Sequence, residues 1–108
     1  MMSYPILSYK SGNQFIFLYP EDIIYIHSSG NYSKMQLTSG KSYTITKNIK
    51  CIESQLPSEI FFRVHHSYVI NLMYVEKFHN NAKAKIQLTD GFIVDLSRRK
   101  KQEFIARF

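Results

Sequence analysis

Cysteine and tryptophan are almost absent from the 108-residue sequence, which has one of the first and none of the second. The single cysteine, Cys51, cannot form a disulfide within the chain or build a thiolate metal site. It lies between Ile49 and Ile52 at helical spacing, which predicts a buried thiol on a short helix. The cysteine content is thus compatible with a reducing compartment.

Long hydrophobic runs are missing as well. No apolar stretch reaches the roughly 18 residues that a membrane span requires, and no signal-peptide pattern opens the chain. We therefore expect a cytoplasmic protein without a membrane partner. The length predicts a single domain over residues 1–108 with one hydrophobic core, and residues 1–5 are expected to be a loose end.

Acidic residues are few relative to basic ones. The chain has 14 Lys and Arg against 8 Asp and Glu, which gives a formal net charge of +6. Such an excess favours an anionic partner, for example nucleic acid, although charge alone does not identify one.

Proline and glycine number only three and four, and most of them mark turns between β-prone runs. The clearest hairpin surrounds Asp90-Gly91, because Ile86 and Leu88 alternate with polar residues before it and the alternation resumes after it. The other turn signals are Pro20-Glu21-Asp22, Gly30-Asn31 and Ser39-Gly40, and they separate expected strands at 14–19, 23–27, 32–37 and 42–45.

Between residues 45 and 57, the apolar residues no longer alternate with polar ones as in a strand but recur at the spacing of a helix. Thr46 is the expected cap and Pro57 the expected stop, so the pattern predicts two to three helical turns lying on the sheet. The end of the chain is compatible with either a short helix or an extended anchor. The apolar residues concerned are Ile45, Ile49, Ile52 and Leu56 in the first segment, and Phe104, Ile105 and Phe108 in the second.

Phenylalanines recur within the strand patterns, and large rings in such positions usually fill a β core. A domain that binds single-stranded nucleic acid would instead expose several of them beside basic residues. We expect the first arrangement for Phe15, Phe17, Phe61, Phe62 and Phe92.

Two clusters of hydrogen-bond donors stand out from the apolar pattern. The run 62–71 carries Arg, two His, Ser and Asn in a β-prone stretch, and residues 97–101 read Ser-Arg-Arg-Lys-Lys. Arg and Lys can contact guanine edges, Asn and His can contact base edges or phosphates, and Ser donates to phosphate oxygens. The two clusters therefore predict a nucleic-acid surface.

Catalytic and metal-binding patterns are not found. His65 and His66 are adjacent, so on a strand they should face opposite ways, and His27 and His79 have no partner at ligand spacing. There is no Gly-x-Ser-x-Gly elbow and no Gly-rich phosphate loop. We expect a protein that is not an enzyme and that has no metal or other cofactor.

Three blocks in order make the chain similar to the LytTR family of bacterial DNA-binding domains, over about residues 15–108. The blocks are residues 23–32, 62–72 and 88–99. His27 stands where the family usually has an acidic residue, and Asp95 where proline is frequent.

The resemblance implies a mainly β fold, with several antiparallel β-sheets and one short α-helix. It also implies that loops, rather than a recognition helix, enter successive major grooves. Asn71 is expected to be structural, because an amide at a strand end can satisfy turn backbone. The implied DNA-binding residues are Asn31, Ser33, Lys34, Arg63, His65, His66, Ser67, Arg98, Arg99 and Lys100.

The implied function is sequence-specific binding of double-stranded DNA by a bacterial transcription regulator. Promoter repeats are the expected partner, and a homodimer on DNA is compatible with the pattern. In the family the module usually follows a receiver domain, as in the response regulator of a two-component system. Two alternatives stay open: a protein-interaction module that docks an acidic partner, and a β domain that binds single strands or RNA.

Overall fold

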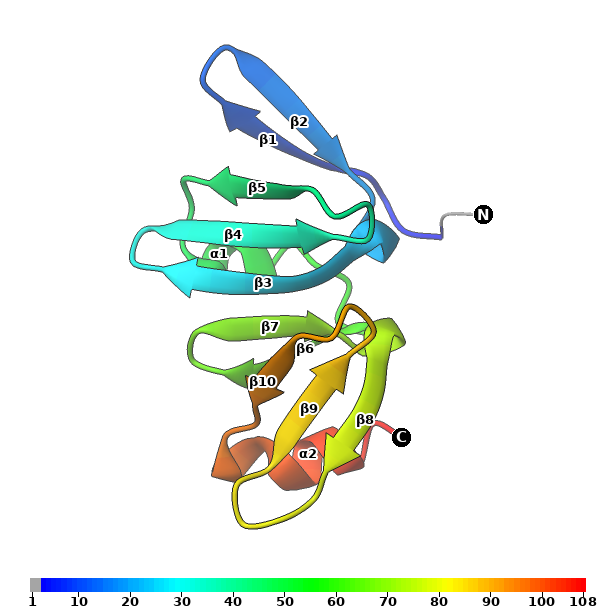
Figure 1. Cartoon of the computed structure of the whole chain (residues 1–108). Helices are drawn as coiled ribbons and strands as arrows, with labels where there is room; N and C mark the ends of the chain where they lie inside the picture. The colour runs from blue at the N-terminus through cyan, green and yellow to red at the C-terminus, as the bar shows by residue number, and fades with distance from the viewer. Residues whose placement is uncertain (1–2) are drawn as a thin grey trace.

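The computed structural model describes residues 3–108, which form three antiparallel β-sheets and two short α-helices (Figure 1). This confirms the mainly β class with several antiparallel sheets. A two-stranded sheet pairs β1 (Leu7–Ser11) with β2 (Gln14–Leu18). The central sheet has the order β5-β4-β3-β7-β6, and its strands are β3 (Ile23–Ser29), β4 (Tyr32–Leu37), β5 (Ser42–Ile45), β6 (Phe61–His65) and β7 (Tyr68–Asn71). The third sheet contains β8 (Val75–His79), β9 (Lys85–Leu88) and β10 (Ile93–Asp95) in the order β10-β9-β8.

The central sheet is buried on both faces, so the molecule has two hydrophobic clusters where the length predicted one core. Successive residues of β7 show the division, because Val69 belongs to one cluster and Ile70 to the other. The first cluster includes residues of the β1–β2 hairpin and of helix α1 (Ile49–Glu53). The second includes residues of the third sheet and Phe104 of helix α2 (Lys101–Ile105).

The first two phenylalanines of the sequence do not fill the core. Phe15 and Phe17 are 63% and 61% exposed, because β2 buries Leu18 and turns the alternate residues outward. The prediction was right for Phe61 and Phe62, which are buried, whereas Phe92 is half-buried and stacks on Tyr25.

The helix predicted between residues 45 and 57 is shorter than expected. Ile45 ends strand β5, and helix α1 begins after Asn48, whose Oδ1 accepts a hydrogen bond from the Cys51 amide at 2.8 Å. Asn48 rather than Thr46 is therefore the cap, and the helix has five residues. Cys51 is half-buried, not fully buried.

Both terminal segments of residues 3–108 contact the rest of the protein. The C-terminal segment forms a helix, α2, and buries Phe104. Of the segment 1–5, which was expected to be loose, residues 1 and 2 lie outside the described residues, and the Ser3 amide donates to the Glu21 carboxylate.

Asn71 has the structural role that the sequence predicted. It is buried, its Nδ2 donates to the Ile23 carbonyl at 2.9 Å, and its Oδ1 accepts from the Met73 amide at 2.9 Å. The side chain thereby joins the start of β3 to the end of β7.

Candidate nucleic-acid interface

The two donor clusters of the sequence meet in the structure. They line one cavity of about 260 Å³, between the β6–β7 turn and the 3₁₀ helix η3 (Arg98–Lys100). The Ser97 amide donates to the Val64 carbonyl at 2.9 Å, which fixes η3 against β6. The lining residues are Glu53, Arg63, His65, His66, Ser97, Arg99 and Lys100.

Arg63 holds the cavity wall together instead of pointing freely into solvent. Its Nη1 donates to Glu53 Oε1 at 2.8 Å, its Nε to the His65 carbonyl at 2.9 Å and its Nη2 to the His66 carbonyl at 2.5 Å. Each nitrogen of the guanidinium therefore already donates inside the protein. Among the predicted DNA contacts, Arg63 is better described as the residue that shapes the β6–β7 turn.

The prediction that His65 and His66 face opposite ways is wrong, because their ring centroids lie 4.2 Å apart. Strand β6 ends at His65, and its pairing with β7 shifts between Arg63 and His65. Such a bulge re-aims the side chain that follows it. His65 Nδ1 accepts from the Ser67 amide at 3.2 Å and so supports the turn, whereas His66 is exposed.

Ser33 is the clearest correction to the predicted site. It is fully buried, and its hydroxyl donates to the Lys47 carbonyl at 2.7 Å. The side chain therefore stabilises the segment between β5 and α1 and cannot reach a ligand. Asn31 is exposed in the β3–β4 turn, where Gly30 takes a φ of 63°. Lys34, predicted from the same loop, is exposed too but lies within strand β4, paired with His27.

The three cations of η3 have different surroundings. Arg99 is exposed and lines the cavity beside His66, whereas Arg98 lines a separate, larger cavity. The Lys100 ammonium lies 5.6 Å from the centroid of the Phe62 ring and 3.8 Å from a Glu103 carboxylate oxygen. Lys100 is half-buried, unlike the exposed Arg98 and Arg99.

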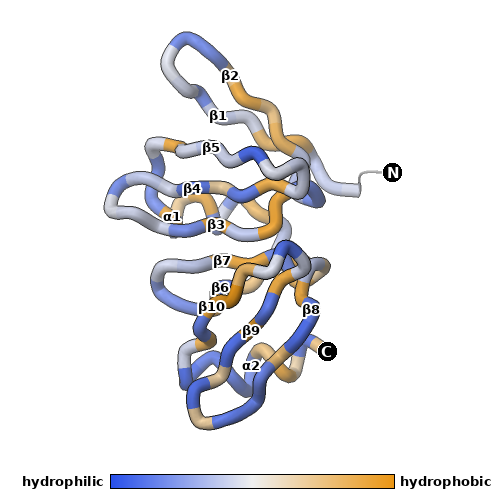
Figure 2. The backbone as a smooth tube through the Cα atoms, viewed as in Figure 1, coloured by the Kyte–Doolittle hydropathy of each residue, from blue (hydrophilic) through white to orange (hydrophobic). Residues whose placement is uncertain are grey.

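All of these residues lie at one edge of the molecule. The β3–β4 turn, the β6–β7 turn and η3 lie one below another along the left side of Figure 1. Figure 2 shows the same three segments mostly in hydrophilic colours. The molecule measures 46 × 33 × 23 Å.

A stack of rings beside this edge was not anticipated from the sequence. Tyr68 stacks on His27 with centroids 4.5 Å apart, and His65 lies on the other strand that borders Tyr68. The register of β3 with β7 brings the first two together, and no local pattern specifies that register. The centroids of the Tyr68 and His65 rings are 6.2 Å apart, so the stack adjoins the residue that ends β6.

Within residues 3–108, no three His, Cys, Asp or Glu side chains gather as a metal-binding group. No helix in the described part of the chain is long and apolar enough to cross a membrane. Among carboxylates near the interface, the Lys85 ammonium beside Asp95 lowers the pKa of that carboxyl below its usual range.

Comparison with known proteins agrees with this architecture. Residues 13–108 match the LytTr DNA-binding domain, and the chain therefore belongs to the LytTR family. It is similar to the sensory transduction protein LytT of Bacillus subtilis (strain 168), with 29% identity over 85% of this chain and 39% of the relative. The LytT protein of Enterococcus faecalis (strain ATCC 700802 / V583) is 27% identical over 86% of this chain and 39% of its own length.

The fold is also seen in a solved structure. A LytTr DNA-binding domain from Bacillus cereus superposes with a TM-score of 0.81, and the match covers 97% of both chains at 15% identity. The present chain spans about two fifths of the curated relatives that it matches.

Proposed function

We propose that the chain binds double-stranded DNA sequence-specifically, as the DNA-binding part of a bacterial transcription regulator. The observation that carries the proposal is the convergence of two donor clusters, about 30 residues apart in sequence, on one cavity at the edge that also bears the β3–β4 turn. Loops at a sheet edge are free to present donors to base edges while the sheets fix their separation.

The exposed residues have distinct roles in this proposal. Arg99 makes a bidentate contact to guanine, and His66 and Asn31 reach base edges in the major groove. Lys34 and Arg98 contact phosphates. Arg63, His65 and Ser67 act indirectly, because their hydrogen bonds shape the β6–β7 turn.

We further propose that the turns of this edge contact successive major grooves. The β3–β4 turn, the β6–β7 turn and η3, which lie along the left edge in Figure 1, enter the groove at two places on one side of the duplex in this proposal.

The proposed partners extend beyond DNA. Promoter repeats would each take one copy, and a homodimer on DNA would follow from two adjacent repeats. The relatives are sensory transduction proteins of which this chain matches 39%, which supports a receiver domain elsewhere in a longer regulator. The proposal includes no catalytic step.

One observation favours a second candidate, binding of single-stranded nucleic acid. Phe15 and Phe17 are exposed on β2, and Lys10 pairs with Phe15 across the hairpin. Exposed rings beside a cation are the platform on which unpaired bases stack.

Selection of bound duplexes from a random pool tests the proposal, because it reports binding and site together. We expect enrichment of a site with two recurring segments about one helical turn apart. Recovery of no common sequence from the duplex pool, with enrichment from a single-stranded pool, would support the second candidate and contradict the first.

A further inference from the structure

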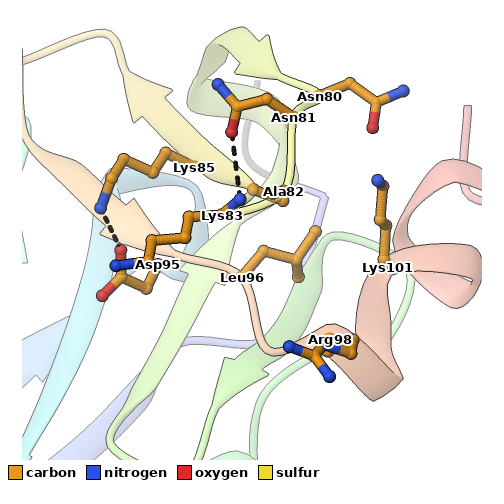
Figure 3. Close-up of a pocket in the computed structure, with 10 residues that line it drawn as sticks. Asn80, Asn81, Ala82, Lys83, Lys85, Asp95, Leu96, Arg98 and Lys101 are labelled. Atoms are coloured by element: carbon orange, nitrogen blue, oxygen red, sulfur yellow. Dashed lines mark hydrogen bonds and ion pairs between the residues drawn. The ribbon is translucent and has the colours of Figure 1, made fainter.

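A second and larger cavity lies beside the candidate interface. It has a volume of about 770 Å³ and lies between the β8–β9 loop, the β9–β10 hairpin and the start of helix α2 (Figure 3). In Figure 3 the Lys101 side chain extends from α2 toward Asn80 of the loop. The lining residues are Asn80, Asn81, Ala82, Lys83, Ala84, Lys85, Asp95, Leu96, Arg98 and Lys101.

The cavity is strongly basic. Its four cationic side chains outnumber its one carboxylate, Asp95, which Lys85 pairs at 2.5 Å. Within residues 3–108, Lys83, Arg98 and Lys101 have no ion-pair partner. Like charges gathered at one opening repel each other, and a bound anion relieves that repulsion.

Asparagines of the β8–β9 loop add hydrogen-bonding groups to the cations. Asn81 Oδ1 accepts a hydrogen bond from the Lys83 amide at 3.2 Å, and this bond helps to order the loop. Asn80 is exposed, and its amide can donate to an oxygen at the cavity mouth. Amides together with Lys and Arg are the groups that contact phosphate oxygens in protein–DNA complexes.

The large cavity adjoins the candidate interface. A third cavity of about 220 Å³ shares His65 with the interface cavity, and it shares Lys85 and Asp95 with the large one. Arg98 and Lys101 line the large cavity, whereas Arg99 and Lys100 line the interface cavity, so the basic run 98–101 borders both. A basic run of this kind suits a polyanion that lies along it, whereas a single small anion would occupy only one point.

We propose that this basic cavity binds the phosphate groups of the DNA segment that flanks the bases read by the turns. The proposal rests on the proposed function and deepens it. Lys83 and Lys101 are the anchoring side chains, and they hold the flank without reading its sequence. The β8–β9 loop thereby becomes a fourth DNA-contacting segment, which none of the sequence signals identified.

The test compares two duplexes with the same central site, one ending at the site and one extended by about 10 base pairs on each side. The variant is the double substitution Lys83→Gln and Lys101→Gln. We expect its affinity for the extended duplex to fall at least fivefold and its affinity for the short one to fall less than twofold. The log–log salt slope on the extended duplex should fall by about 0.9 for each phosphate that the variant no longer neutralises.

The matched control is Lys41→Gln with Lys77→Gln, which removes the same charge from exposed sites. Neither residue lines any of the three cavities. The control should bind both duplexes within twofold of wild type, and unfolding midpoints should agree for all proteins. Lys83→Gln alone, in an exposed loop, should give part of the loss and guards against misfolding of the double variant.

The outcomes separate the two proposals. Equal behaviour of variant and control on the extended duplex would overturn the flank site while leaving DNA binding intact. An equal loss on both duplexes would overturn it too, because the lysines would then contact the centre. A wild-type protein that binds neither duplex would overturn the proposed function and the flank site together.

Discussion

Arg63 and Glu53 form an ion pair, with Nη1 2.8 Å from Oε1, that joins helix α1 to the strand leading into the β6–β7 turn. The same guanidinium donates to the carbonyls of His65 and His66. One half-buried side chain thus links the helix to the turn that carries the exposed histidine of the interface.

Arg63→Lys should destabilise the protein by about 1–2 kcal/mol, because an ammonium cannot reproduce the forked contacts of a guanidinium. Affinity should fall more for the specific duplex than for a random one, because the displaced turn carries His66, the proposed contact to a base edge. Urea unfolding and duplex titration measure the two effects. Glu53→Gln is the control, and it should cost under about 1 kcal/mol because that carboxylate is partly exposed.

Arg99→Ala should lower specific affinity by about 1–3 kcal/mol and relax the preference at one base pair. Lys34→Ala is a better phosphate control than Lys100→Ala, because Lys100 also packs over Phe62. Lys34→Ala should weaken binding to all duplexes by a similar factor. Titration against single-base variants of the selected site checks both, and equal losses on specific and random duplexes for the two proteins would remove Arg99 from the reading role.

His66→Ala should leave the free energy of unfolding within about 0.5 kcal/mol of wild type, since the side chain is exposed. Specific binding should fall at least tenfold, or about 1.4 kcal/mol. His65→Ala should instead destabilise by about 1 kcal/mol, because it removes the acceptor of the Ser67 amide. An early-melting His66→Ala protein, or one that binds as tightly as wild type, would assign His66 to the scaffold.

Asp95→Asn should raise duplex affinity, because it removes the carboxylate from the basic cavity and frees Lys85 for phosphate. The Lys85 ammonium lowers the pKa of Asp95, so the carboxyl stays ionised as pH falls from about 7 to about 5. Acidification over that range therefore cannot reproduce the effect of the substitution. Titrations of both proteins at pH values of about 7 and 5.5 check this, and an affinity gain that disappears at the lower pH would contradict it.

Local signals predicted the hairpins well. The β9–β10 hairpin follows from strict alternation and from Asp90-Gly91, where Gly91 takes a φ of 91° that favours glycine. Strand β1 was missed because its sequence, Leu-Ser-Tyr-Lys-Ser, carries only two apolar residues, and pairing with β2 makes it a strand.

The helix was predicted in the right segment but too long, for a tertiary reason. The spacing of four apolar residues matches a helical period, and all four are buried in the first hydrophobic cluster: Ile45, Ile49, Ile52 and Leu56. Ile45, however, reaches that cluster from strand β5, and residues buried in the same core need not belong to the same element. A helical period in the sequence therefore cannot distinguish a single helix from a strand followed by a helix.

The site was predicted as a set of residue types, and the structure divides it by where each hydrogen bond goes. Ser33 and Arg63 are as polar as Lys34 and Arg99, but each donates to a group distant in the sequence, the Lys47 carbonyl 14 residues away and the Glu53 carboxylate 10 residues away. The bulge that brings the rings of His65 and His66 together likewise has no local signature.

Equilibrium titration of the selected duplex against its own single strand and a scrambled duplex, at two salt concentrations, tests the central claim most directly. The account predicts binding at least about 10³-fold tighter to the selected duplex than to the scrambled one. It also predicts an affinity that falls with salt by about 0.9 log units per decade for each phosphate neutralised. Equal affinity for the single strand and the duplex, or a salt slope near zero, would contradict it.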